Sequence, residues 1–332
     1  MTTVLQQLTH SLIQSMEKDK TVYLLGEDIL DPYGGAFKVT NGISNRFPER
    51  VWTTPISEAS IVGLAIGMAM RGLRPVVEIM FGDFVTLAMD QIVNHAAKFK
   101  WIYNDQVYVP LVIRTPMGGH RGYGPTHSQS LEKLLIGVPG LRVVAPNTVG
   151  DPGLLLENAI FDNDPVIFIE HKLLYPCHSL VTGKGEFQDW NVEQFGEKFP
   201  TFKLNINKES MVTIATYGYS FELVRQAATE LLMEEEIFTE IFLFSQLNPM
   251  DLSALSNSLR TTKKLITVEE GTVTLGWGSE VMARMAEADL NYLKMMRVGA
   301  KDFPIANSKI LEDQILPSKS SIKIAIKKMI KR

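Results

Sequence analysis

The stretch TTPISEASIVGLAIGMAMRGLRPVVEI at residues 53–79 decides the fold. Small and apolar residues fill almost all of positions 59–67, and Ser57 stands just before them as a capping residue, so we predict a helix over Ser57–Arg71. The β-rich run Arg74–Ile79 follows and predicts a buried strand. An apolar helix followed by a short apolar strand is the repeating unit of a parallel sheet with helices on both faces.

The same alternation extends in both directions from this stretch. Further strands are predicted at Val22–Gly26, Val109–Arg114, Leu141–Ala145 and Val166–Glu170, and further helices at Phe84–Tyr103, Ser130–Ile136 and Thr148–Asp162. The first residues read as an amphipathic helix. We therefore predict a doubly wound α/β domain over residues 1–175.

A second α/β domain is predicted after a change in composition. Residues 176–209 are rich in Gly, Asp, Lys and Pro and show little periodicity, which predicts a linker with a short hairpin. Strands are then predicted at Met211–Thr216, Glu240–Phe244, Lys264–Val268 and Met295–Gly299, and helices at Ser220–Glu236, Met250–Thr261 and Trp277–Ala288. This smaller doubly wound domain spans residues 210–332.

Composition excludes several classes of protein. Lys plus Arg is 33 and Asp plus Glu is 37, so the formal net charge of −4 argues against a nucleic-acid-binding protein. The single cysteine, Cys177, excludes an internal disulfide and paired-cysteine metal sites. The longest apolar run, Ile61–Met70, is shorter than the roughly 20 residues of a membrane span, and the first residues lack the apolar core of a signal peptide. We expect a cytoplasmic protein with no nucleic-acid or membrane partner, whose Lys-rich end at 318–332 is a helix with a solvated basic face.

Two side chains are candidates for proton chemistry. Glu58 begins the apolar helix and is either a carboxylate favoured by the helix dipole or a partly desolvated acid at the mouth of the sheet. His127 lies in the glycine-rich stretch RTPMGGHRGYGPTHSQS at 114–130, where it is either a surface histidine or a proton-transfer group. That stretch does not fit the dinucleotide-binding fingerprint, and the sequence has no GxxxxGK[ST] phosphate loop.

Eight segments in a fixed order carry a family resemblance that covers nearly the whole chain. They are GEDI at 26–29, GGAFKVTNGI at 34–43, the stretch at 53–79, FVTLAMDQIVNHAAK at 84–98, VPLVIRTPMGG at 109–119, THSQSLEKLLIGVPGLRVVAPN at 126–147, DNDPVIFIEHKLLY at 162–175 and EEGTVTLGWGSEV at 269–281. The chain resembles the beta subunit of the thiamine-diphosphate-dependent first component of 2-oxo acid dehydrogenases of the pyruvate, branched-chain or acetoin type. The resemblance implies a transketolase-like pyrimidine-binding domain followed by a transketolase C-terminal-type domain.

The resemblance also implies a reaction and partners. The beta subunit supplies the aminopyrimidine half of a thiamine diphosphate site for oxidative decarboxylation of a pyruvate-like 2-oxo acid and acyl transfer to lipoamide. An alpha subunit in an α2β2 heterotetramer holds the diphosphate and most of the Mg²⁺ contacts, and a lipoyl-bearing acyltransferase accepts the product. No GDG motif followed by Asn occurs in this sequence, in agreement with such a split site.

Four residues match the family's functional positions. Glu58 matches the glutamate that hydrogen-bonds the pyrimidine ring nitrogen, and Phe84 matches the aromatic residue that packs on that ring. His127 matches the loop histidine associated with acyl transfer to the lipoyl arm. Glu27 lies in the segment that matches the family's pyrimidine-side motif, where it either lines the cofactor pocket or caps its strand.

A potassium site and two departures complete the comparison with the family. Ala159, Asp162 and Asp164 match a structural K⁺ site built from backbone carbonyls. Leu87 stands where some relatives carry Glu or Gln, and residues 101–106, WIYNDQ, lack a common Gly-Gly pair. These departures favour an alternative, a half-subunit of another thiamine-diphosphate enzyme such as a transketolase-like or decarboxylase pair in a biosynthetic pathway. A scaffold that has lost its chemistry is a third interpretation, against which Glu58, Phe84 and His127 together argue.

Overall fold

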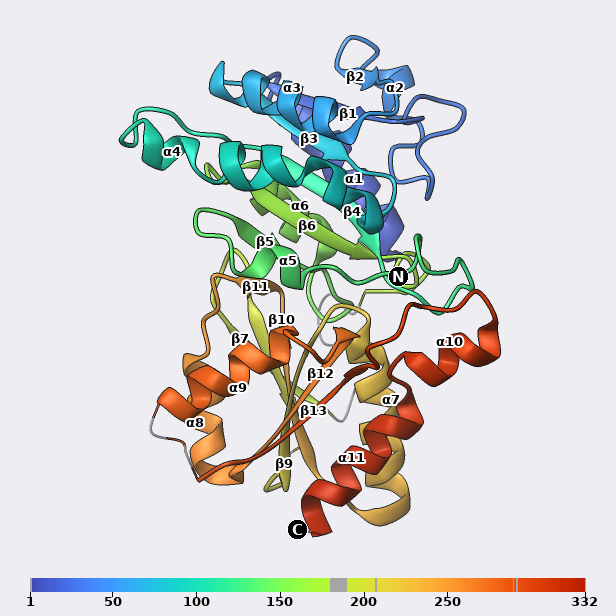
Figure 1. Cartoon of the computed structure of the whole chain (residues 1–332), viewed down its shortest axis with the longest axis vertical. Helices are drawn as coiled ribbons and strands as arrows, with labels where there is room; N and C mark the ends of the chain where they lie inside the picture. Colours follow the sequence, from blue (N-terminus) through green and yellow to red (C-terminus); the bar gives the residue numbers. More distant parts are fainter. Residues whose placement is uncertain (1, 180–189, 207, 289, 291, 332) are drawn as a thin grey trace.

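Two α/β domains are stacked end to end in the computed structural model, which describes residues 2–179, 190–206, 208–288, 290 and 292–331 (Figure 1). The first domain holds a seven-stranded sheet in the order β11-β5-β6-β4-β3-β1-β2. Its strands are β1 (Val22–Gly26), β2 (Val51–Thr53), β3 (Arg74–Glu78), β4 (Val112–Met117), β5 (Arg142–Val144), β6 (Val166–His171) and β11 (Gln246–Asn248). All neighbours are parallel except β11, which comes from the second half of the chain and pairs antiparallel with β5.

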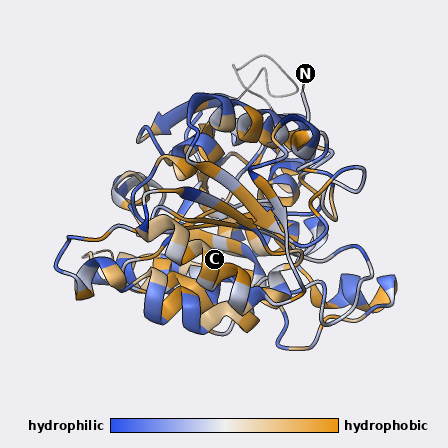
Figure 2. Cartoon of the chain, turned by 90° about the horizontal axis from the view of Figure 1, so that it is seen from above, coloured by the Kyte–Doolittle hydropathy of each residue, from blue (hydrophilic) through white to orange (hydrophobic). Residues whose placement is uncertain are grey.

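Helices cover both faces of this sheet because successive strand residues point to opposite sides. Leu24 packs with α1 (Val4–Lys18) and α6 (Pro152–Ile160), whereas Leu25 packs with α3 (Glu58–Met70). Shorter helices complete the domain: α2 (Ile43–Arg46), α4 (Phe99–Ile102) and α5 (Lys133–Ile136). Figure 2 shows the apolar strands in the middle of the molecule, with polar positions on the surrounding helices.

The single helix expected at Phe84–Tyr103 is wrong. The chain instead forms a 3-10 helix η1 (Gly82–Ala88), a π-helix η2 (Gln91–Ala96) and then α4. The Thr86 hydroxyl donates to the Asp83 carbonyl at 2.9 Å, which offers the backbone an alternative to regular α-helical bonding. The apolar spacing of this stretch did not reveal the change of helix type.

The second domain is a six-stranded sheet in the order β13-β12-β9-β10-β8-β7. Its strands are β7 (Asn191–Phe195), β8 (Thr201–Asn205), β9 (Val212–Tyr217), β10 (Thr239–Phe244), β12 (Lys264–Thr272) and β13 (Lys294–Ala300). Its helices are α7 (Ser220–Glu235), α8 (Ser253–Thr262), α9 (Trp277–Glu287), α10 (Lys309–Ile315) and α11 (Lys319–Lys331). No helix among the described residues is long and apolar enough to cross a membrane.

The stretch predicted as a linker contains part of this second sheet. β7 and β8 form an antiparallel hairpin, and β8 pairs antiparallel with β10. Residues 180–189 and 207 of that stretch lie outside the described residues. The bounds given above for the two domains and the linker stay a prediction.

The Lys-rich end of the chain forms the expected terminal helix, α11. Its lysines face acidic residues of α7 rather than solvent alone: Lys323 Nζ lies 3.0 Å from Glu230 and 2.9 Å from Glu234, and Lys327 pairs with Glu235. This pairing gives the basic face of α11 a partner within the chain.

A buried ionic network joins three neighbouring strands of the first sheet. Arg114 on β4 donates from Nε and Nη2 to the Glu170 carboxylate on β6, at 2.7 and 2.8 Å, and from Nη1 to Glu78 on β3 at 2.9 Å. The Tyr175 hydroxyl also donates to Glu170, at 2.5 Å. Arg114 is 2% exposed. Burial raises the pKa of Glu78 although the Arg114 charge opposes the shift, so this guanidinium compensates two desolvated acids.

Buried glutamates also line the contact between the two domains. Glu132, which precedes α5, accepts a hydrogen bond from the Tyr217 hydroxyl of β9 at 2.7 Å. Glu269 of β12 accepts from the first backbone N–H groups of α9, Trp277 at 2.7 Å and Gly278 at 2.9 Å. Burial, together with the nearby Glu132 charge, raises the pKa of Glu269 to about 7. Burial raises the pKa of Glu132 as well.

The Arg114 network gives a stability prediction. We expect Arg114→Met to lower the free energy of unfolding by about 3–5 kcal/mol, because Glu78 and Glu170 stay buried without their cation. Urea denaturation followed by tryptophan fluorescence measures the change. Arg284→Met is the matched control, since Arg284 forms a half-exposed pair with Glu280 and its loss changes stability by less than about 1 kcal/mol. A decrease in the free energy of unfolding as small as that of the control would contradict the proposal that this ionic network stabilises the fold.

The Glu132–Glu269 pair predicts a pH dependence. A carboxyl whose pKa is raised binds its proton more tightly in the folded state, so the free energy of unfolding falls as pH rises from about 4.5 to about 7. The fall is on the order of 3 kcal/mol. Glu132→Gln keeps an acceptor for Tyr217 and removes the repelling charge, so we expect a shallower slope. Urea midpoints across this pH range measure it, with the exposed Glu280→Gln as control; parallel slopes in all three proteins would refute the coupling.

Candidate active site

The four predicted site residues follow four neighbouring strands. Glu27 comes directly after β1, Glu58 lies after β2, Phe84 after β3 and His127 on the loop after β4. In the sheet these strands are adjacent, in the order β2-β1-β3-β4, and they run parallel. Ligands of open parallel sheets bind outside the carboxyl ends of the strands. The topology therefore brings all four residues to the edge of the sheet where a ligand site is expected.

Glu27 and Glu58 form an acidic pair at this edge. Both are buried, at 8% and 5% exposure. Burial raises the pKa of Glu27, and the neighbouring charges of Glu58 and Asp28 raise it further. Within the described residues, Glu27 Oε1 is buried and has no hydrogen-bond partner. An unsatisfied buried carboxylate oxygen is costly unless a ligand donor completes it, so Glu27 Oε1 is free to accept a hydrogen bond from a ligand.

The start of α3 differs in one detail from the prediction. Ser57 occupies the N-cap position, but its side chain makes no capping hydrogen bond and its hydroxyl donates to Ser60 Oγ at 2.8 Å. The first N–H groups of α3 therefore have no side-chain cap from Ser57. Glu58 lies in this first turn, where the helix dipole favours a negative charge.

Phe84 and His127 belong to an aromatic cluster. The ring centroids of Phe84 and His127 lie 5.3 Å apart in an edge-to-face arrangement, and Phe81 lies 4.7 Å from His127 and 5.9 Å from Phe84. Tyr123 lies 6.3 Å from Phe81. The Thr126 hydroxyl and His127 Nδ1 are 3.0 Å apart, within hydrogen-bond distance. The cluster thus places aromatic rings edge-on around an imidazole.

The loop that carries His127 is held by Glu270 of the second domain. The Glu270 carboxylate accepts from the Gly119 backbone N–H at 2.8 Å and the Ser130 hydroxyl at 3.0 Å, and it lies 2.9 Å from His171 Nε2. Burial alone would raise the pKa of Glu270, but the charge and hydrogen bond of His171, the charge of His120 and the Gly119 N–H hold it at about 2. The sequence analysis did not single out this glutamate, because its partners lie far away along the chain.

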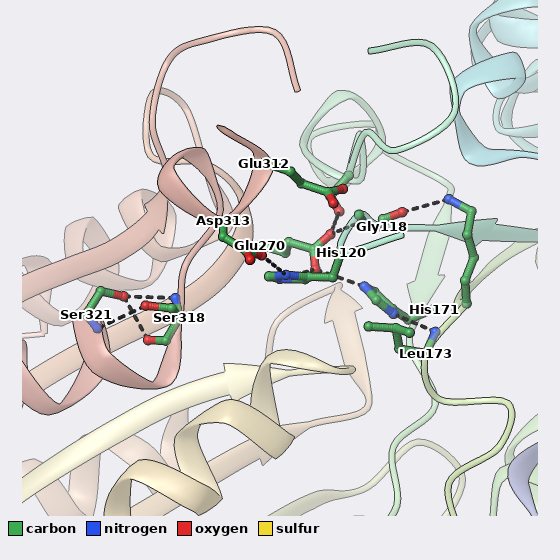
Figure 3. A network of polar contacts seen from close by, with 12 residues as sticks. Gly118, His120, His171, Leu173, Glu270, Glu312, Asp313, Ser318 and Ser321 are labelled. Atoms are coloured by element: carbon green, nitrogen blue, oxygen red, sulfur yellow. Dashed lines mark hydrogen bonds and ion pairs between the residues drawn. The ribbon is translucent and has the colours of Figure 1, made fainter. Parts of the chain in front are cut away.

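Acidic residues of α10 approach the same loop. Figure 3 shows Glu312 and Asp313 near His120, with Glu270 on the same side. Glu312 accepts from the Gly122 N–H at 3.0 Å, and His120 Nδ1 lies 3.8 Å from Asp313. The glycine-rich loop is thus tied to the second domain at several points rather than being a free turn.

The predicted potassium positions lie at the end of α6, which holds Ala159, and in the turn between α6 and β6. The carboxylates of Asp162 and Asp164 face Arg142, at 3.6 and 3.7 Å, and the Asp162 carbonyl accepts from Arg74 at 2.8 Å. The Ala159 carbonyl accepts from the Asp162 N–H at 3.3 Å. Nowhere in the described part of the chain do three or more His, Cys, Asp or Glu side chains form a group that could hold a metal ion. Protein cations already balance this turn, and the potassium site stays a prediction.

The two departures from the family pattern both lie on the surface. Leu87 is 59% exposed on η1, and Trp101 is 86% exposed on α4. Trp101 lines an apolar cavity of about 590 Å³ between α4 and the Pro139–Gly140 turn. This cavity lies away from the aromatic cluster, and none of the four predicted site residues lines it.

Comparison with known proteins places the chain among related sequences. A family model described as "Transketolase, pyrimidine binding domain" matches residues 2–178, and one described as "Transketolase, C-terminal domain" matches residues 203–322. The pyruvate dehydrogenase E1 component subunit beta of Rickettsia bellii is 35% identical, over 98% of each chain. The mitochondrial pyruvate dehydrogenase E1 subunit beta-1 of Arabidopsis thaliana is 36% identical, over 98% of this chain and 88% of the relative.

The chain is also similar to a subunit of another oxidoreductase and to one solved structure. The beta subunit of acetoin:2,6-dichlorophenolindophenol oxidoreductase of Cupriavidus necator is 35% identical, over 98% of this chain and 96% of the relative. A solved structure described as a split gene transketolase, inactive beta4 tetramer, superposes with a TM-score of 0.76 over 100% of this chain and 99% of that one. At 20% identity this last likeness concerns the fold alone.

Proposed function

Because the chain belongs to the transketolase-like family of E1 beta subunits of 2-oxo acid dehydrogenases, we propose that it supplies the aminopyrimidine half of a thiamine diphosphate site. The reaction is oxidative decarboxylation of a pyruvate-like 2-oxo acid, followed by acyl transfer to lipoamide. The observation that carries the proposal is the gathering of Glu27, Glu58, Phe84 and His127 at one edge of the first sheet. The full-length relatives favour this function over the alternative of another thiamine-diphosphate enzyme.

Each residue has a distinct part in this proposal. Glu58 hydrogen-bonds a pyrimidine nitrogen and shares its proton, so that the exocyclic amine can act as a base. Phe84 packs against the ring face, and Glu27 offers its unpaired oxygen to a ring substituent. Bound thiamine diphosphate supplies a nucleophilic carbon for attack on the substrate carbonyl. His127, edge-on to Phe84, delivers or accepts a proton when the acyl group leaves for the lipoyl arm.

An exposed apolar face on helix α3 supports the proposal that a partner subunit binds there. Helix α3 is apolar on all sides, a pattern typical of helices that are buried all round. Its outer face nevertheless lies open: Leu64 is 50% exposed, and an added Cβ at Gly67 would meet no atom within 4 Å. Ile56, which precedes the helix, is 85% exposed. An apolar face of this kind marks an interaction site. We propose that an alpha subunit covers it in an α2β2 heterotetramer and holds the diphosphate and Mg²⁺.

A lipoyl-bearing acyltransferase and a cytoplasmic location complete the proposal. The relatives named above include one mitochondrial plant protein and two bacterial proteins, so location follows from the source of the chain rather than from its fold. The acyltransferase is required by the acyl-transfer step and is part of the same proposal.

Titration calorimetry tests the split site. Thiamine diphosphate with Mg²⁺ is titrated into the chain alone and into its complex with an alpha-type partner subunit. We expect binding by the complex and none by the chain alone, because the diphosphate ligands lie on the partner. Binding of equal strength by the isolated chain would contradict the half-site, and absence of binding by the complex would contradict the cofactor.

Replacing Glu58 tests the proposed proton chemistry. We expect Glu58→Gln to lower the decarboxylation rate of the complex by about 100-fold or more, because the amide cannot share a proton with the pyrimidine. The rate is measured with pyruvate and an artificial electron acceptor, and urea midpoints check that the fold is intact. Glu49→Gln, at an exposed position, is the matched control. An unchanged rate in Glu58→Gln would exclude this role.

A further inference from the structure

A fully buried lysine closes the loop that carries His127. Lys172 is the first residue after β6 and is 0% exposed. Its ammonium donates to the Gly118 carbonyl at 2.7 Å and to the His127 carbonyl at 2.8 Å. One cation thus joins the two ends of the loop at 118–127 and fixes both to the end of a central strand.

The ammonium of Lys172 donates its hydrogen bonds to backbone carbonyls. Burial lowers its pKa to about 8, and the charges of Asp83, Glu270 and Glu312 oppose that shift. Among the described residues, no carboxylate lies within ion-pair distance of Nζ, so the nearby acids act through space. A buried ammonium is costly, and here its hydrogen bonds go to two loop carbonyls.

The same ammonium orders the aromatic cluster. It stands 5.4 Å from the centroid of Phe81, and Phe81 packs edge-on against the His127 ring at 4.7 Å. A cation over an aromatic face is attracted to the ring. Lys172 therefore contacts His127 in two ways, directly at its carbonyl and indirectly through Phe81.

The other anchors of the loop act on different residues. Glu270 holds the Gly119 N–H and Glu312 holds the Gly122 N–H, both in the first half of the loop. The His127 N–H bonds within the loop, to the Gly124 carbonyl at 3.4 Å. Within the part of the chain that the structure describes, the bond from Lys172 is the one that ties the His127 backbone to the sheet.

We propose that Lys172 is a positioning residue that sets the His127 imidazole for acyl transfer; this inference rests on the proposed function. In that step the lipoyl disulfide is the oxidant: its S–S bond would break as one sulfur takes up the electron pair that loss of CO₂ leaves on the substrate carbon. Release of the acyl group would return its bonding electrons to the cofactor and lose the hydroxyl proton. One sulfur forms the thioester bond to the acyl carbon, and the other takes a proton, which the His127 imidazole delivers. A displacement of about 1 Å in such a group can slow a step by about 100-fold.

The test compares two reactions of the assembled complex. Lys172→Met keeps an unbranched side chain of similar length and removes the positive charge and the hydrogen-bond donors. We expect lipoamide-dependent acyl transfer from pyruvate to fall by about 10–100-fold, and decarboxylation with an artificial acceptor to fall by less than about 3-fold. His127→Ala shows the same selective loss, and the double variant is no slower than His127→Ala, because residues that act as a unit are non-additive. Lys198→Met, at a side chain 65% exposed, is the control.

A readout independent of turnover follows the loop itself. Arg121 is exposed on the loop, so trypsin can cut after it when the loop opens. We expect faster cleavage at Arg121 in Lys172→Met than in the wild type or Lys198→Met. If Lys172→Met does not assemble with its partner, Lys172→Gln, which keeps an N–H donor, carries the same comparison of the two rates.

The outcomes separate this inference from the proposed function. Equal loss of both reactions in His127→Ala would overturn the proposed role of His127. The positioning role alone would be overturned if His127→Ala showed the selective loss but the Lys172 variant lost both reactions equally. It would also be overturned if the effects of the two substitutions were additive. Unchanged cleavage at Arg121 would also overturn it.

Discussion

The guanidinium of Arg114 connects three strands at the edge where the candidate active site lies. It pairs with Glu78 at the end of β3 and with Glu170 on β6. These bonds hold the central strands in fixed positions relative to one another along the strand direction. Phe84 follows β3, the His127 loop follows β4, and Lys172 follows β6. A shift of any one strand would displace the group that it carries. The buried ions thus contribute mainly by defining geometry, which is where buried ion pairs have their best-attested use.

The site also depends on the second domain, although all four predicted residues lie in the first. Glu270 and Glu312 reach across the domain contact and bind backbone N–H groups of the glycine-rich loop. Carboxylates are strong acceptors for such groups. Because Gly118 is close to His171, where an added Cβ would meet Nε2 at 2.0 Å, the loop packs too tightly against the sheet to tolerate a side chain there. Carboxylates of the second domain therefore help to hold the glycine-rich loop that carries His127.

Local patterns allowed much of this structure to be predicted. The strand Val22–Gly26 and the helix α3 follow from apolar spacing, and the four strand-end residues follow from the family pattern. The change from 3-10 to π-helix after Gly82 was missed because apolar spacing does not distinguish one helix type from another. Lys172 and Glu270 were missed for another reason. Their partners are distant in sequence, and a single lysine or glutamate carries no periodic signal.

The strand β11 has a consequence for how the chain can fold. Gln246–Asn248 lies in the sequence of the second domain, yet it pairs with β5 and covers one edge of the first sheet. A fragment limited to the first domain would expose β5 as an open edge, which is a template for aggregation. Translation must therefore pass residue 248 before the first sheet is complete, so the early domain depends on late-synthesised sequence for protection.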